Sequence, residues 1–127
     1  MTRVYIDMVG DLFHYGHVNA LKQSKEQGDY LIVGIHSDKT VETYKRTPIL
    51  NMNERIEVIR SCKYVDEIIQ DAPLKVSYEY IKTHKIDLIS VPNNRNKDEF
   101  NLMYGELDKL GVIKRFNYTE TISTTDI

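Results

Sequence analysis

The chain has little of several residue types that would mark a specialised protein. Its 127 residues include one cysteine, no tryptophan, three prolines and six glycines. A single cysteine excludes a disulfide within the chain, disfavours a structural zinc cluster and argues against secretion. No apolar run is long enough to cross a bilayer, and Asp7 interrupts the first one too early for a signal-peptide core. We therefore expect a cytoplasmic protein with no membrane span.

An excess of charge of one sign is also missing. Seventeen basic and nineteen acidic residues give a formal net charge of −2, and no long basic run is present. Nucleic acid is therefore not expected as a partner, because its backbone is bound by clustered basic side chains. With 41% apolar and 28% charged residues, the composition is that of an ordinary globular protein. The length predicts one domain spanning residues 1–127.

Strand and helix patterns alternate along the chain. Runs of apolar, mostly β-branched residues predict five strands, near residues 4–9, 30–36, 65–69, 86–91 and 112–116. Helical spacing predicts helices between them, near 18–27, 52–62, 77–85 and from Phe100 to Leu110, where Gly111 ends the last one. Parallel strands need such crossovers. The sequence therefore predicts an α/β, three-layer Rossmann-like fold, with a five-stranded parallel sheet and helices on both faces.

Polar side chains gather where the predicted strands end. In an open α/β sheet, ligands bind outside the carboxyl ends of the strands, so these residues are expected to form one composite site. The segments that follow the first, second, fourth and fifth strands contribute Asp11, His14 and His17; His36 and Asp38; Asn93 to Asn96; and Thr119 to Thr125.

The segment His14-Tyr15-Gly16-His17 is the sharpest motif. Gly16 permits a close backbone approach, and both histidines come at the start of a helix, where free N–H groups and the helix dipole favour anions. This arrangement predicts a phosphate site whose imidazoles take up protons when a nucleotide binds. Two alternatives remain open at this point: surface histidines that cap a helix, and a zinc pair with His36 as the third ligand.

A second motif lies near the end of the chain. Ser123, Thr124 and Thr125, preceded by Ile122, offer three hydroxyls and backbone N–H groups where a further helix would begin. Such groups can hold part of a polyphosphate. Ordinary helix capping is the alternative interpretation.

Together these motifs resemble the CTP-dependent cytidylyltransferases of the HxGH nucleotidyltransferase superfamily. The matching segments are DLFHYGHVNAL at 11–21, GDYLIVGIHSD at 28–38, NERIEVIRSCKYVDEIIQDAP at 53–73 and ISTTDI at 122–127. HYGHVNAL and VDEIIQDAP most resemble the phosphoethanolamine and phosphocholine enzymes. The length and the terminal ISTT also suit the glycerol-3-phosphate enzymes.

The resemblance implies a reaction and the residues that perform it. A phosphate oxygen of the acceptor would attack the α-phosphate of CTP in line, and pyrophosphate would leave without a covalent enzyme intermediate. The resemblance assigns the catalytic roles to His14, His17, Lys45 and Arg55. Lys45 would bridge the two phosphates and Arg55 would neutralise phosphate charge. A solvated loop is the alternative for Lys45, and an exposed pair with Glu54 or Glu57 is the alternative for Arg55.

The resemblance also implies the binding residues and accessory factors. Asp11 would be a supporting or metal-linked acid, Asp38 would reach the cytidine, and Ser123 to Thr125 would close over the β- and γ-phosphates. The full set expected to bind nucleotide is Val9, Gly10, Asp11, Gly16, Asp38, Ile122, Ser123, Thr124 and Thr125. Mg²⁺ is expected to arrive with CTP, with no metal site of the protein's own. Related enzymes are commonly dimers, which implies a homodimer.

Three departures from the family pattern leave the acceptor open. Gly10 stands where the family has an aromatic residue, Asn93 and Asn94 stand in place of an acid pair, and Tyr118 and Thr121 replace an arginine and a glycine. By likeness the acceptor is phosphoethanolamine first, phosphocholine second and glycerol 3-phosphate third. Competing functions are a nucleotide-binding module with weakened activity, an adenylyltransferase that uses ATP in the same site, and a zinc-dependent hydrolase.

Overall fold

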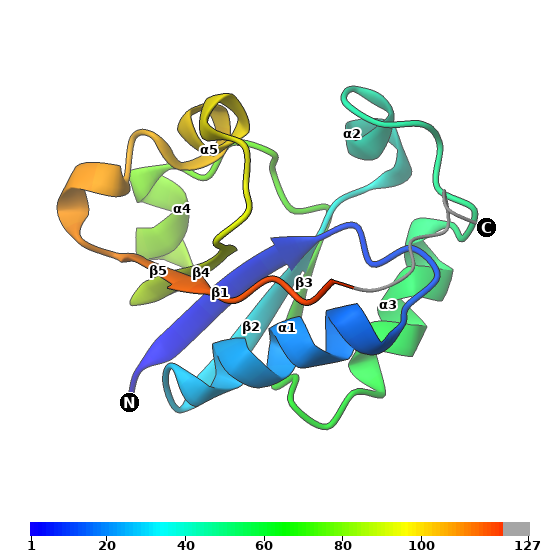
Figure 1. The fold of residues 1–127 in the computed structure, drawn as a ribbon, viewed down its shortest axis with the longest axis horizontal. Coiled ribbons are helices and arrows are strands. Elements are labelled where there is room, and N and C mark those ends of the chain that lie inside the picture. Colours follow the sequence, from blue (N-terminus) through cyan, green and yellow to red (C-terminus); the bar gives the residue numbers. More distant parts are fainter. Residues whose placement is uncertain (121–127) are drawn as a thin grey trace.

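A computed structural model describes residues 1–120, in which five parallel strands form one sheet (Figure 1). The strands are β1 (Arg3–Met8), β2 (Tyr30–Ile35), β3 (Glu67–Gln70), β4 (Leu88–Pro92) and β5 (Ile113–Phe116). Their order in the sheet is β3-β2-β1-β4-β5, and each neighbouring pair is parallel. The predicted five-stranded parallel sheet is confirmed.

Helices connect the strands. They are α1 (Tyr15–Glu26), α2 (Asp38–Glu42), α3 (Met52–Arg60), α4 (Tyr78–Thr83), α5 (Lys97–Tyr104) and the 3₁₀ turn η1 (Asp108–Leu110). The sequence pattern missed α2, because this helix has five residues and buries only Val41, which leaves no apolar stripe to detect. The helix expected to run to Gly111 stops at Tyr104, and Gly111 follows η1 in the left-handed region at φ 71°.

Each face of the sheet has its own apolar core. Val4 and Ile6 of β1 pack with Leu21 of α1 and Ile59 of α3. On the other face, Tyr5 packs with residues of α4, β4 and α5, among them Ile81, Ile89, Phe100 and Met103. Figure 1 shows α1 and α3 on one side of the sheet and α4 and α5 on the other. Fully burying one such side chain stabilises the fold by about 1.5–3 kcal/mol, so both layers hold the sheet in place.

The position of β1 determines where a ligand can enter. β1 is central, and the chain moves to β2 on one side of it and later to β4 on the other. A crevice forms at such a switch point, between the carboxyl ends of the two diverging strands. Residues from the ends of β1 and β4 therefore face a common space. Across residues 1–120, no helix has both the length and the apolar character that crossing a membrane requires.

Candidate active site

A cavity of about 650 Å³ opens at this crevice. That volume lies within the range of small-molecule sites. The residues singled out from the sequence that line the cavity include Val9, Gly10, Asp11, His14, Gly16, His17, Lys45, Arg95, Tyr118 and Thr119. His36 lines it too. The predicted gathering of these side chains at one edge of the sheet is therefore present.

The two histidines close the N-terminus of α1. Nδ1 of His14 accepts a hydrogen bond from the Gly16 N–H at 3.0 Å, and Nδ1 of His17 accepts one from the His14 N–H at 3.1 Å. Because each Nδ1 is an acceptor, the ring proton of each imidazole is assigned to Nε2. The ring centroids lie 4.2 Å apart. The pair therefore presents two N–H donors from neutral rings that line the cavity.

His17 is held in its neutral form. Burial, with smaller contributions from His14 and Lys45, lowers the pKa of His17 from 6.5 to about 4, and Asp11 opposes this shift. At neutral pH the ring can donate a hydrogen bond without carrying charge. The expected proton uptake on nucleotide binding would have to overcome both the burial and the cap, and it stays a prediction.

Gly10 has a structural reason to be glycine. Its φ is +68°, and a Cβ at this position would come within 2.4 Å of the Ile59 side chain. Only glycine adopts that conformation in so small a space without strain. The departure from the family's aromatic residue is thus matched by the packing of Ile59, and the loop still leads directly into the histidine motif.

Arg55 does not lie where the sequence suggested. The residue is fully buried and is absent from the cavity lining, and its Nη2 donates to Oδ1 of Asp38 at 2.6 Å. Nη1 donates to the carbonyl oxygens of Val9 and His36 at 2.7 and 2.9 Å, and Nε donates to the carbonyl of Leu50 at 3.1 Å.

The contacts of Arg55 correct two interpretations. The exposed pairing with Glu54 or Glu57 is wrong, because the helix turns Arg55 into the protein. Its contacts favour a structural role, in which Arg55 ties together the loops that follow β1 and β2. Direct contact with phosphate is less favoured. The Asp38 carboxylate likewise forms an ion pair with this guanidinium, and Asp38 does not line the cavity.

Asp11 fixes the loop that carries the basic residues. Its two carboxylate oxygens accept the N–H groups of Ile49 and Leu50 at 2.8 and 2.9 Å. This ties the segment 45–50 to the loop after β1. Lys45 and Arg46 in that segment both line the cavity. The segment that carries Lys45 and Arg46 therefore borders the same cavity as the histidines. It is not only a solvated loop, which was the alternative for Lys45.

A second wall of the cavity contains His36 and Arg95, which the sequence analysis placed at this edge of the sheet, and Asp7, which it did not single out. Asp7 on β1 is 5% exposed, and its Oδ1 accepts the Tyr104 hydroxyl at 2.6 Å while Oδ2 has no partner among the described residues. Burial raises the pKa of Asp7, although His36, Tyr104 and Arg95 oppose the rise. We call Asp7, His36, Arg95 and Met103 the acid wall, and Gly10, Asp11, His14, His17 and Lys45 the histidine wall.

His36 faces the unpartnered oxygen of Asp7. Its Nδ1 lies 3.1 Å from the carbonyl oxygen of Ala72, to which it donates. Its Nε2 lies 4.0 Å from Oδ2 of Asp7, and both side chains are buried. The imidazole and the carboxylate thus face each other inside the protein. The sequence signal that could have revealed Asp7 is a lone carboxylate inside an otherwise apolar strand.

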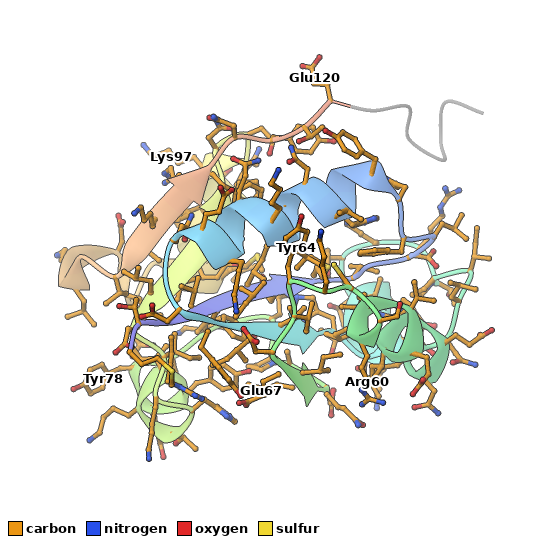
Figure 2. All side chains as sticks on the ribbon, turned by 90° about the horizontal axis from the view of Figure 1, so that it is seen from below. Arg60, Tyr64, Glu67, Tyr78, Lys97 and Glu120 are labelled. Carbon is orange, nitrogen blue, oxygen red and sulfur yellow. The ribbon has the colours of Figure 1, made fainter. Side chains whose placement is uncertain are left out.

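The chain beyond β5 forms the rim of the cavity. Gln23 of α1 exchanges two hydrogen bonds with the backbone of Asn117, and Asn19 of α1 bonds Thr119. Asn93 accepts the Tyr118 N–H at 3.1 Å. This part of the chain runs alongside α1 as far as Glu120 (Figure 2). Tyr118 and Thr119 line the cavity, whereas Ile122, Ser123, Thr124 and Thr125 lie outside the described residues.

The zinc-centred alternative lacks its ligand cluster. Within residues 1–120, no group of three histidine, cysteine or carboxylate side chains is arranged to hold a metal ion. His36 lies on the acid wall and directs its Nδ1 at the backbone carbonyl of Ala72, whereas His14 and His17 lie at the N-terminus of α1. The hydrolase reading is therefore not supported by the described part of the chain.

Comparison with known proteins gives a consistent family. The family model described as cytidylyltransferase-like matches residues 10–127. The chain is 38% identical to the probable ethanolamine-phosphate cytidylyltransferase of Encephalitozoon cuniculi, covering 100% of this chain and 40% of that protein. It is also 38% identical to choline-phosphate cytidylyltransferase 2 of Arabidopsis thaliana, covering 99% of this chain and 43% of that protein. The chain thus spans about two fifths of the length of these relatives.

A solved structure supports the fold. The lipopolysaccharide core biosynthesis protein of Thermoplasma volcanium superposes with a TM-score of 0.78 at 31% identity, covering 94% of this chain and 99% of that one. Its length therefore matches that of this chain, unlike the longer relatives.

Proposed function

The chain belongs to the cytidylyltransferase-like family, and we propose from this that it transfers CMP from CTP to a phosphorylated alcohol, releasing pyrophosphate and forming a CDP-alcohol. The observation that carries the proposal is the pair of neutral imidazoles at the N-terminus of α1, lining a cavity of about 650 Å³. Imidazole N–H donors and the free N–H groups of a helix start are suited to bind phosphate oxygens.

Catalysis in this proposal rests on position and charge. A phosphate oxygen of the acceptor attacks the α-phosphate of CTP, the bond to the β-phosphate oxygen breaks, and pyrophosphate leaves. His14 and His17 donate to the oxygens on which negative charge develops, and Lys45 bridges the two phosphates. Arg55 acts indirectly by fixing the loops. Ser123, Thr124 and Thr125 are proposed to close over the β- and γ-phosphates.

The acid wall supports an ammonium-bearing acceptor. An ammonium ion that reached the buried Asp7 carboxylate would give Oδ2 its missing donor and stabilise its ionised form. Oδ2 of Asp7 lacks a hydrogen-bond donor among the described residues, and the ammonium of ethanolamine has N–H donors that a trimethylammonium group lacks. Phosphoethanolamine is therefore the preferred acceptor, phosphocholine the second and glycerol 3-phosphate the third. The carboxylate missing at Asn93 and Asn94 is supplied from β1 instead.

Mg²⁺ is proposed to enter with CTP. The cavity-lining carboxylates do not form a cage, and both oxygens of Asp11 accept backbone N–H groups. An ion carried by the triphosphate fits such a donor set better than a resident metal. When bound, it would offset charge on the β- and γ-phosphates. We further propose a single domain, a homodimer and a cytosolic location, in keeping with the CTP chemistry.

The test is pyrophosphate release from CTP with a panel of phospho-alcohols, repeated with ATP. We expect the highest kcat/KM with CTP and phosphoethanolamine. Preference for ATP would indicate an adenylyltransferase instead. Tight CTP binding by calorimetry with no release for any acceptor would identify a nucleotide-binding module, the alternative that Gly10, Tyr118 and the missing acid pair motivate.

A further inference from the structure

Arg95 is a cation of the cavity that the resemblance does not account for. It belongs to the loop between β4 and α5, in which the family has an acid pair, and it is partly buried while its neighbours Asn93, Asn94 and Asn96 are exposed. Of the segment 92–96, only Pro92 and Arg95 line the cavity. The loop therefore turns its positive residue inward and its amides outward.

Within residues 1–120, the guanidinium of Arg95 has no anionic partner. In that part of the chain its one side-chain hydrogen bond runs from Nη1 to the thioether sulfur of Met103 at 3.4 Å, and sulfur is a weak acceptor. Among residues 1–120, no carboxylate lies within 4.0 Å of its nitrogens. A partly desolvated guanidinium with unused donors is suited to a carboxylate or phosphate of a ligand, which it can bind with two parallel hydrogen bonds.

The neighbours of Arg95 place it at the acceptor end of the cavity. Met103, which it contacts, directly precedes Tyr104, and the Tyr104 hydroxyl bonds the Asp7 carboxylate. Arg95 and Asp7 thus flank the same part of α5, and Arg95 is among the groups that oppose the rise in the pKa of Asp7. The phosphate-binding histidines belong to α1, on the opposite face of the sheet.

We propose that Arg95 binds the phosphate of the acceptor, while Asp7 binds its ammonium group. This inference rests on the proposed function, because it assumes that a phospho-alcohol enters this end of the cavity. The attacking phosphate carries about two negative charges and must approach a triphosphate. Repulsion between the two anions would oppose that approach, and a guanidinium beside the acceptor phosphate offsets it.

An opposite-charge pair on one wall also matches the charge pattern of the acceptor. Phosphoethanolamine is a short zwitterion in which two carbons separate the phosphate from the ammonium. Glycerol 3-phosphate would satisfy Arg95 but leave Asp7 unpaired. Arg95 therefore sets affinity for any phospho-alcohol, and Asp7 selects among them.

The decisive experiment compares Arg95→Gln with Arg115→Gln. Arg115 is a matched control because its guanidinium stacks on Phe100 of α5 at 4.5 Å and does not line the cavity. We expect Arg95→Gln to raise the KM for phosphoethanolamine by about 10- to 100-fold, with the KM for CTP changed by less than about threefold. Arg115→Gln should leave both constants unchanged, and Arg95→Lys should recover part of the loss.

A second measurement separates this inference from the proposed function. Calorimetric titration of phosphoethanolamine into the CTP-loaded protein reports binding whether or not turnover occurs, and thermal unfolding shows whether each variant is folded. Weaker binding to folded Arg95→Gln, with Arg115→Gln like the wild type, supports the inference even if no pyrophosphate is released. Wild-type binding by folded Arg95→Gln overturns it, as does a loss confined to CTP.

A double-mutant cycle with Asp7→Asn tests the rival role of Arg95 as a counterion for Asp7. If Arg95 only balances that carboxylate, removing it in the Asp7→Asn background should not affect the binding of phosphoethanolamine, and the inference fails. If Arg95 binds phosphate, the same fold-loss should persist in that background.

Discussion

The two walls of the cavity are built in different ways. The histidine wall draws most of its residues from one continuous stretch, Gly10 to His17, and the acid wall draws single residues from four places, at Asp7, His36, Arg95 and Met103. The first is fixed by helix capping between neighbours in sequence, and the second by the parallel sheet. In the proposed function, a local motif provides the phosphate chemistry, while tertiary structure provides the contacts that select the acceptor.

The largest expected effect comes from breaking the anchor that both walls share. Arg55 bonds the carbonyl of Val9 beside the histidine wall and that of His36 on the acid wall. Arg55→Ala should lower the free energy of unfolding by about 3–5 kcal/mol, because it leaves buried carbonyl groups and the Asp38 carboxylate without their hydrogen-bond donor. Urea denaturation measures this. Arg60→Ala, which removes an exposed pair with Glu57, should change stability by about 0.5 kcal/mol or less; equal losses would contradict the anchor role.

Replacing the imidazole of His14 in the histidine wall should reduce turnover without unfolding α1. His14→Asn keeps a preferred N-cap residue that can still accept the Gly16 N–H. We expect a loss in turnover on the order of 10²- to 10³-fold with little change in the KM for the acceptor. His14→Ala should lose similar activity and also stability, and His17→Ala should lose activity to the same extent. Near-normal turnover in His14→Asn would show that the ring serves only as a cap.

The acid wall should respond through acceptor choice. In Asp7→Asn the Tyr104 hydroxyl retains an oxygen acceptor, but the ammonium loses its charged partner. The KM for phosphoethanolamine should rise by about 10- to 100-fold, while that for glycerol 3-phosphate stays within about threefold. Steady-state kinetics with both acceptors gives the ratio. A parallel rise for both would mean that Asp7 has a general structural role.

The smallest expected effect is a pH dependence of stability that originates in the histidine wall. Because the pKa of His17 is about 4 in the folded chain and 6.5 in a free histidine, the unfolded chain binds more protons between those values. Stability should therefore fall as the pH drops from 6.5 towards 4, by at most about 1.4 kcal/mol per pH unit from this residue. His17→Gln keeps the capping acceptor and removes the titration. Denaturation midpoints from pH 7 to pH 4 should slope less in the variant, and parallel slopes would exclude the effect.

The sheet and the histidine motif were predictable because their signals are local. Buried strands read as apolar runs, and the spacing of His14, Gly16 and His17 reads as a helix start facing an anion. α2 was missed because it buries one side chain, and the role of Arg55 was misjudged because burial of a guanidinium depends on carbonyls from distant loops. Asp7 gave a weak signal, a single acid within an apolar strand. Its partners on α5 and β2 become neighbours only after folding.

The pleat of β1 has a consequence for how this protein can change. Asp7 and Met8 are adjacent, yet the pleat turns them to opposite faces of the sheet, and Asp7 stands beside Gly34 in the ladder with β2. Losing one residue before Asp7 would present the Met8 thioether where the carboxylate stands, and gaining one would present Ile6 there. Either change would also turn the core-facing side chains of the strand to the opposite faces. Point substitutions on the strand and its neighbours are therefore the open route to a new acceptor, whereas insertions and deletions can accumulate only beyond its ends.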